Sequence, residues 1–179
     1  WFTSTRNSPF CKALSDELFN KSEFDDWANE HVVRLRIDAT IKGKTDGERV
    51  EKRKYVESLK KRYKIMGHPV VLVISPRGTE FGKYRGFKRG NGELYWGRLK
   101  NAARSAQRDY SDWKNEMEGK GYRVWHNVAG KGVFAKASRY RDGKLWLIEP
   151  DGRKSVTTVN KLSGDDRVYI EKKLKESRR

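Results

Sequence analysis

Gly67-His68-Pro69, running directly into Val70-Val71-Leu72-Val73-Ile74, is the stretch that decides the fold. An unbroken apolar run of this length, rich in β-branched side chains, is typical of a strand covered on both faces. Ser75-Pro76-Arg77-Gly78 then predicts a tight turn, and residues 81–87 predict a return strand. The first half of the chain is therefore expected to be built around a buried β-hairpin.

Upstream of the hairpin, the sequence predicts two helices, a strand and a third helix. Ser8-Pro9 followed by apolar residues at 11, 14 and 18 predicts a helix with Ser8 at its N-cap and Pro9 at its first position. Ser22 is expected to cap a second, short helix. Residues 32–37 alternate between apolar side chains and arginine, which indicates a strand. A polar loop over 40–49 precedes the third, basic helix.

Two helices pack against the hairpin in this interpretation, one before it and one after it. The basic helix buries Val56, Leu59 and Tyr63, and it exposes the cationic stretches Lys52–Lys54 and Lys60–Arg62. The closing helix is expected to bury a stripe composed of Leu94, Leu99, Ala102, Ala103 and Ala106. Residues 107–120 are polar and form either a linker or an extension of that helix.

After this segment the pattern changes to short strands. Residues 122–126, 133–140, 145–149 and 154–159 predict four strands, with hairpin turns at Asp142-Gly143 and Asp151-Gly152. Ser163-Gly164-Asp165-Asp166 opens a last helix, whose acidic start and basic end match the helix dipole. The chain is thus predicted to hold an α/β domain over 1–106 and a β-rich domain over 121–176.

Composition narrows the classes of protein that remain. Charged residues make up 36% and the mean hydropathy is −0.97, but 12% aromatics, with six tryptophans, favour a folded chain over a disordered polyelectrolyte. No apolar stretch is long enough for a membrane span or a secretory leader. One cysteine excludes an intramolecular disulfide within this sequence, and three scattered histidines give no metal-ligand spacing, so we expect neither metal nor cofactor.

The N-terminal half resembles the thioredoxin-like family. The elements that carry the resemblance are Phe2-Thr3 at a strand end, Ser8-Pro9-Phe10-Cys11 opening a helix, Phe24 and Trp27, Ile37-Asp38 ending a strand, and Gly67-His68-Pro69. The resemblance implies a central mixed sheet with flanking helices and a cis-proline at Pro69 beside the first helix. Because the chain starts at Trp1-Phe2-Thr3, we expect an N-terminal strand or export signal to be missing from it. The family resemblance implies an exported or periplasmic location.

The four-residue motif departs from the family at the position that matters most. In the resemblance, Ser8 stands where the family has its nucleophilic cysteine, and Cys11 stands at the resolving position. A serine hydroxyl cannot start thiol-disulfide exchange. Ser8 could equally be a plain helix cap and Cys11 a small core residue. A sharper hypothesis is a hydrolytic dyad in which His68 activates Ser8.

The C-terminal domain resembles the first Sla homology domain. The motifs are Tyr122-Arg123-Val124-Trp125, Phe134-Ala135-Lys136-Ala137, residues 142–147, Asp151-Gly152-Arg153 and residues 159–163 with Asp166 and Tyr169. The resemblance implies a small SH3-like β-barrel with a terminal helix and binding of short peptides. Trp125 and Trp146 are candidates for either the core or a binding platform, and strand alternation favours burial of at least one.

Three functions remain open at this point. The first is a non-catalytic binding or scaffolding protein that recognises a protein or peptide partner through surfaces including Pro9 and Phe10. The second is a thiol-disulfide oxidoreductase, either a Cys→Ser variant or one that uses Cys11 in mixed disulfides. The third, favoured least, is nucleic-acid binding by the basic surfaces of a chain whose formal charge is +17. The sequence does not indicate the oligomeric state.

Overall fold

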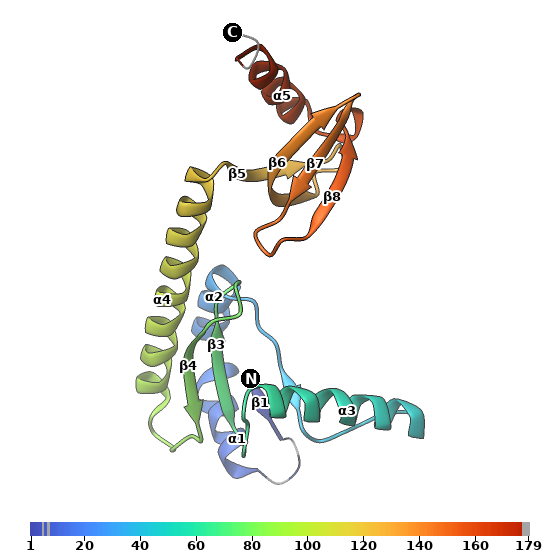
Figure 1. Ribbon diagram of the computed structural model, residues 1–179. Coiled ribbons are helices and arrows are strands. Elements are labelled where there is room, and N and C mark those ends of the chain that lie inside the picture. Colours follow the sequence, from blue (N-terminus) through green and yellow to red (C-terminus); the bar gives the residue numbers. More distant parts are fainter. Residues whose placement is uncertain (5, 7, 177–179) are drawn as a thin grey trace. The chain divides into compact units, whose positions relative to one another are not determined.

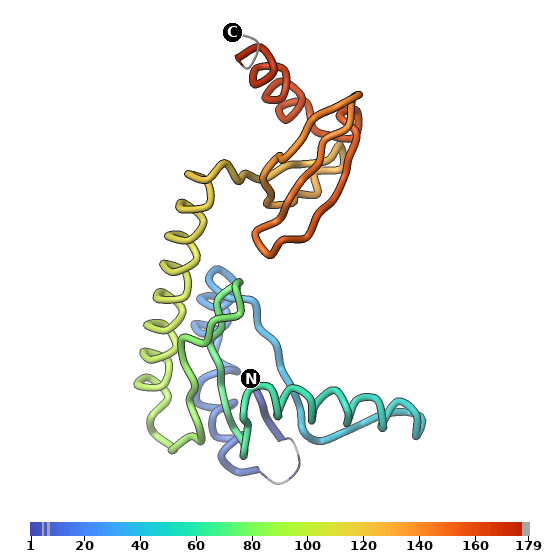
Figure 2. Tube along the Cα trace, viewed as in Figure 1, coloured from blue at the N-terminus to red at the C-terminus, as the bar shows by residue number. Residues whose placement is uncertain are grey.

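A computed structural model describes residues 1–4, 6 and 8–176 of the chain (Figure 1). The chain divides into two compact units, Trp1–Tyr110 and Ser111–Arg179. The trace in Figure 2 runs through the first unit in blue and green and through the strands of the second in orange. None of the helices among the described residues combines the length and apolarity that crossing a bilayer requires.

The first unit is built on a four-stranded mixed sheet in the order β2-β1-β3-β4. Its strands are β1 (Phe2–Thr3), β2 (Ile37–Asp38), β3 (Val70–Ile74) and β4 (Glu80–Arg85). β1 pairs in parallel with β2 and antiparallel with β3, while β3 and β4 form the predicted hairpin. The predicted hairpin is thus confirmed, with β4 shorter than expected at its C-terminal end. Its burial is limited to Val70 and Val71, since the rest of β3 is half-buried and β4 is half-buried or exposed.

Four helices and one π-helical turn surround this sheet (Figure 1). They are α1 (Pro9–Leu14), η1 (Ser15–Phe19), α2 (Ser22–His31), α3 (Asp46–Arg62) and α4 (Gly92–Gly119). α4 continues through most of the segment that was expected to be a linker or a helix extension.

Two hydrophobic clusters cover the two faces of the sheet. The larger joins α1, α2 and α4 to Val71, and the other joins α3 to Val70. Neighbouring residues of a strand point to opposite faces, so Val70 and Val71 enter different clusters. This explains the unbroken apolar run in β3, because both faces of that strand are covered.

Three sequence predictions are wrong in detail. Residues 32–36 are not a strand: Val33 is fully exposed and Leu35 is 63% exposed. Ser22 lies inside α2, whose N-cap residue is Lys21 and makes no side-chain cap. Leu94 is 55% exposed, although the rest of the predicted α4 stripe is buried. In the first turn of α4, Tyr95 and not Leu94 is therefore the buried side chain.

The second unit holds four antiparallel strands in the order β5-β6-β7-β8. They are β5 (Tyr122–His126), β6 (Gly132–Arg141), β7 (Lys144–Ile148) and β8 (Lys154–Thr158), followed by η2 (Val159–Lys161) and α5 (Gly164–Glu176). The predicted β6–β7 turn is confirmed, with positive φ at Asp142 and Gly143. The sheet is not closed into a barrel in the described part of the chain. Its core contains Trp125, Ala135, Leu145, Leu147, Leu162 and Ile170.

Candidate functional site

The start of α1 is a capped helix terminus. Ser8 has an extended backbone, and its Oγ accepts a hydrogen bond from the Cys11 N–H at 3.3 Å. The Ser8 carbonyl accepts from the Lys12 N–H at 3.1 Å. Pro9, at the first helical position, has no N–H that would need a partner. The Ser8 hydroxyl oxygen therefore satisfies one of the backbone donors that a helix start leaves open.

Cys11 and Phe10 face different environments although they are adjacent. Cys11 is only 3% exposed, and Phe10 is 57% exposed. A disulfide of another protein can react only with a thiol that it can reach. The motif therefore exposes an aromatic ring at the surface and encloses its sulfur.

Pro69 directly precedes β3 and is joined to His68 by a cis peptide bond. Pro69 is almost fully buried, and its carbonyl accepts from the Gly86 N–H at 2.8 Å. This bond ties the proline to the residue after β4. Pro69 is thus held by the hairpin itself.

His68 does not pair with Ser8 in the described structure. Burial lowers the pKa of His68, and the charge of Lys60 lowers it further, against opposing contributions from the Phe2 backbone and Asp38. Its buried Nδ1 has no hydrogen-bond partner among the described residues. The hydrogen bonds of the described residues include none between His68 and Ser8, so the geometry needed for a hydrolytic dyad is not present.

The two candidate tryptophans of the second unit, Trp125 and Trp146, differ in burial. Trp125 is 2% exposed, and its Nε1 donates to the Ala135 carbonyl at 2.9 Å. Trp146 is half-buried, with the Arg139 guanidinium 5.3 Å from its ring centre. Trp125 therefore belongs to the core, while Trp146 keeps part of its ring available.

The basic surface of α3 is partly neutralised by its own helix. Lys60 forms an ion pair with Glu57 at 2.9 Å. Glu48 and Glu51 lie on the same helix. The charge pattern is that of a solvated helix surface, and it does not by itself favour a polyanion.

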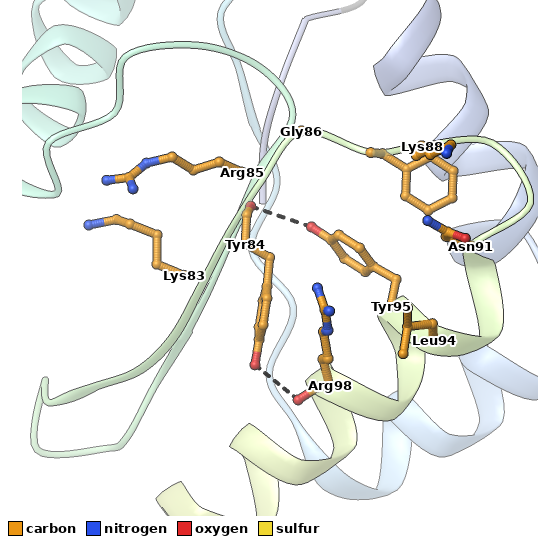
Figure 3. A pocket seen from close by; sticks show the side chains of 10 residues that line it. Lys83, Tyr84, Arg85, Gly86, Lys88, Asn91, Leu94, Tyr95 and Arg98 are labelled. Atoms are coloured by element: carbon orange, nitrogen blue, oxygen red, sulfur yellow. Dashed lines mark hydrogen bonds between the residues drawn. The ribbon is translucent and has the colours of Figure 1, made fainter.

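Sequence reasoning missed a cavity of about 410 Å³ between β4 and the start of α4 (Figure 3). Its lining consists of Lys83, Tyr84, Arg85, Gly86, Phe87, Lys88, Asn91, Leu94, Tyr95 and Arg98. The sequence signal for this cavity is the alternation Lys83-Tyr84-Arg85 in a strand, followed by further cations. The position of the cavity cannot be predicted from this pattern alone, because it depends on β4 lying at the edge of the sheet. No group of three metal-ligating side chains occurs among the residues described.

The fold of the first unit, with the Ser8–Cys11 motif at the start of α1 and Pro69 before β3, is that of a thioredoxin-like protein. Residues 1–95 match the thioredoxin-like domain family, and the chain belongs to that family. The predicted thioredoxin-like α/β fold is therefore confirmed.

Two known proteins are similar to part of this chain. A Chlamydia pneumoniae protein named Disulfide bond reductase DsbH is 28% identical over 102 residues, covering 57% of this chain and 59% of the relative. A solved structure named DsbH Oxidoreductase is 26% identical, with a TM-score of 0.49, covering 57% of this chain and 69% of that one. The chain thus spans less than two thirds of its curated relative.

Proposed function

We propose that this thioredoxin-like domain binds a protein partner without exchanging the partner's disulfides. One observation carries the proposal: an oxygen, Ser8 Oγ, caps the helix where the family motif would place its nucleophilic sulfur. Disulfide exchange starts when a thiolate attacks a disulfide sulfur. The neutral Ser8 hydroxyl is no substitute for that thiolate, because a stable S–O bond does not form in such exchange.

The number of thiols in the chain supports the same conclusion. Reducing a substrate disulfide needs two thiols: the first forms a mixed disulfide, and the second displaces the substrate and leaves a new intramolecular disulfide. Cys11 is the single cysteine of the sequence given. If its thiol were reached, Cys11 could form the mixed disulfide but no second thiol of this chain could resolve it. This chain therefore cannot complete a two-electron cycle alone.

We assign partner recognition to the surface around the Ser8–Cys11 motif. Pro9 and Phe10 are exposed at the start of α1, and an exposed aromatic ring can bury apolar area against a partner. In the second unit, the half-buried Trp146 would add a peptide-binding surface of the kind the Sla homology resemblance implies.

Export of the protein is a further part of this proposal, and fractionation of the producing cells would test it.

A redox role is the second candidate, because the Chlamydia pneumoniae relative is named a disulfide bond reductase. It requires a sulfur at position 8. Ser8→Cys supplies this sulfur at a helix N-terminus, where a thiolate is stabilised. If the fold still holds the machinery of its relative, this single change restores exchange.

Insulin reduction by dithiothreitol, followed by turbidity, tests both candidates. We expect the unaltered chain and Cys11→Ala to match the uncatalysed rate, and Ser8→Cys to exceed it. Ser8→Ala is the matched control, since it changes the same position without adding sulfur. Catalysis by the unaltered chain that is lost in Cys11→Ala would overturn the proposal in favour of one-cysteine chemistry.

A further inference from the structure

The outer edge of β4 has no strand partner in the described part of the chain. β4 lies at the end of the sheet order β2-β1-β3-β4 and pairs only with β3. Gly86 N–H donates to Pro69, so Tyr84, two residues earlier, also directs its backbone groups toward β3. The intervening Arg85, and likewise Lys83, must then direct N–H and C=O groups outward. Neither residue has a backbone hydrogen-bond partner beyond the β3–β4 ladder among the described residues.

The cavity lies along this edge, and side chains project from both faces of the strand. Figure 3 shows Lys83 and Arg85 on one side of β4, and Tyr84 with Tyr95 and Arg98 on the other. An extended peptide laid along the edge would present its own side chains alternately to these two faces. The cavity thus offers the two requirements of an added strand: free backbone groups and side chains for recognition.

The lining is cationic and contains no carboxylate. Its cations are Lys83, Arg85, Lys88 and Arg98. Lys83 pairs with Glu80 at 3.1 Å, while no ion pair is found for the other three among the described residues. Clustered cations without counter-charges repel one another and attract anions. The charge therefore specifies an acidic occupant.

Two aromatic side chains, Tyr84 and Tyr95, pack together in the cavity wall and leave its positive charge unchanged. Tyr84 Oη donates to the Arg98 carbonyl at 3.0 Å, and the Tyr84 and Tyr95 rings lie 5.7 Å apart. Burial raises the pKa of Tyr95, and it raises that of Tyr84 against the opposing effect of Arg98. Both phenols thus stay uncharged, and their rings offer apolar contact between the cations.

We propose that the β4 edge binds an extended acidic peptide segment of a protein partner as an added strand. This surface is separate from the start of α1, so the inference goes beyond the proposed function and is tested without any redox assay. A second copy of β4 is a poor occupant, because like charges from Lys83 and Arg85 would face each other across the new pair. An acidic strand instead gains an ion pair with Arg85 on one face or with Arg98 on the other, according to the face that its carboxylates occupy.

Fluorescence anisotropy on the full chain tests this site, with a fluorescein-labelled peptide of alternating Glu and Val, about eight residues long, as the probe. At low salt we expect saturable binding, weakened about tenfold by Arg85→Glu with Arg98→Glu. The matched control is Arg53→Glu with Lys54→Glu, which makes the same charge change on exposed positions of α3 and leaves binding unchanged. Circular dichroism verifies that both double variants fold.

Two further probes separate strand addition from general attraction of anions. The same peptide methylated at every backbone nitrogen, which removes the N–H donors of the added strand in either register, should lose most of its affinity. A single-stranded oligonucleotide of equal charge should bind more weakly than the unmodified peptide. Equal binding of the methylated peptide, tighter binding of the oligonucleotide, or an equal loss in the α3 control would each overturn the inference.

Discussion

Two helices of this protein begin with the same serine cap. They differ in the residue whose backbone N–H the cap accepts. Ser8 caps α1 and Ser163 caps α5, and each hydroxyl oxygen accepts the N–H of the residue three positions later at 3.3 Å. That residue is Cys11 in α1 and Asp166 in α5, and both are almost fully buried. The two helix starts are thus equivalent in geometry and different in chemistry.

Asp166 is surrounded by partners. It accepts from the His126 N–H at 2.6 Å and from the Ser163 hydroxyl at 3.0 Å, and it forms an ion pair with Arg123 at 2.8 Å. The comparison teaches that capping alone can account for a serine at this position, since Ser163 makes the same hydrogen bond at the start of α5. At α1 the same cap holds a thiol that the fold encloses, which is why we assign no redox role to Ser8.

Removing the Asp166 carboxylate should have the largest effect on stability. Asp166→Ala leaves Arg123 and the His126 N–H without their buried acceptor, and we expect a loss of about 3 kcal/mol. Hydrogen exchange of the β5–β8 amides in the full chain measures it. Asp166→Asn, which keeps an acceptor oxygen, should lose less, and equal losses would contradict the assigned network.

Cys11 should tolerate an apolar replacement better than a polar one. Cys11→Ser places a hydroxyl in a buried site and should cost about 1–3 kcal/mol, whereas Cys11→Ala loses only packing contacts. Urea unfolding of both variants, followed by circular dichroism, gives the difference. A Cys11→Ser protein as stable as Cys11→Ala would show that the site is open to water.

The two caps should each contribute about 1 kcal/mol. Ser163→Ala is expected to cost more than Ser8→Ala, because the Ser163 hydroxyl also donates to Asp166. Ser22→Ala is the matched control: Ser22 lies inside α2 and caps nothing, so its replacement should be close to neutral. A loss at Ser22 as large as that at Ser8 would remove the basis of the comparison.

His68 should give the smallest effect, visible only through pH. Its folded-state pKa lies below the ordinary value of 6.5, mainly because of burial, so below that pH the unfolded chain binds more protons than the folded one. Stability should therefore fall as pH drops from about 7.5 to about 5.5. The fall should be shallower in His68→Gln, measured by urea unfolding across that range, and parallel curves would contradict the assignment.

Local signals in the sequence predicted much of this structure. The run at Val70–Ile74, the Ser8 cap and the Asp142-Gly143 turn each act through neighbouring residues, and the structure confirms them. Residues 32–36 alternate like a strand, yet β2 is limited to Ile37–Asp38 because β1 offers only Phe2–Thr3 as a partner. The β4 edge could not be predicted, since it depends on which strand ends the sheet. Tertiary pairing, and not local propensity, decided both cases.

The most direct test of the central claim is the reactivity of Cys11 toward a thiol-specific disulfide reagent such as 5,5′-dithiobis(2-nitrobenzoate). On the folded, unaltered chain we expect release of far less than one equivalent of thiolate product while an exposed-cysteine peptide reacts completely, and a full equivalent once the chain is unfolded in guanidinium. Rapid release of a full equivalent from the folded protein would contradict a thiol withheld from disulfide chemistry.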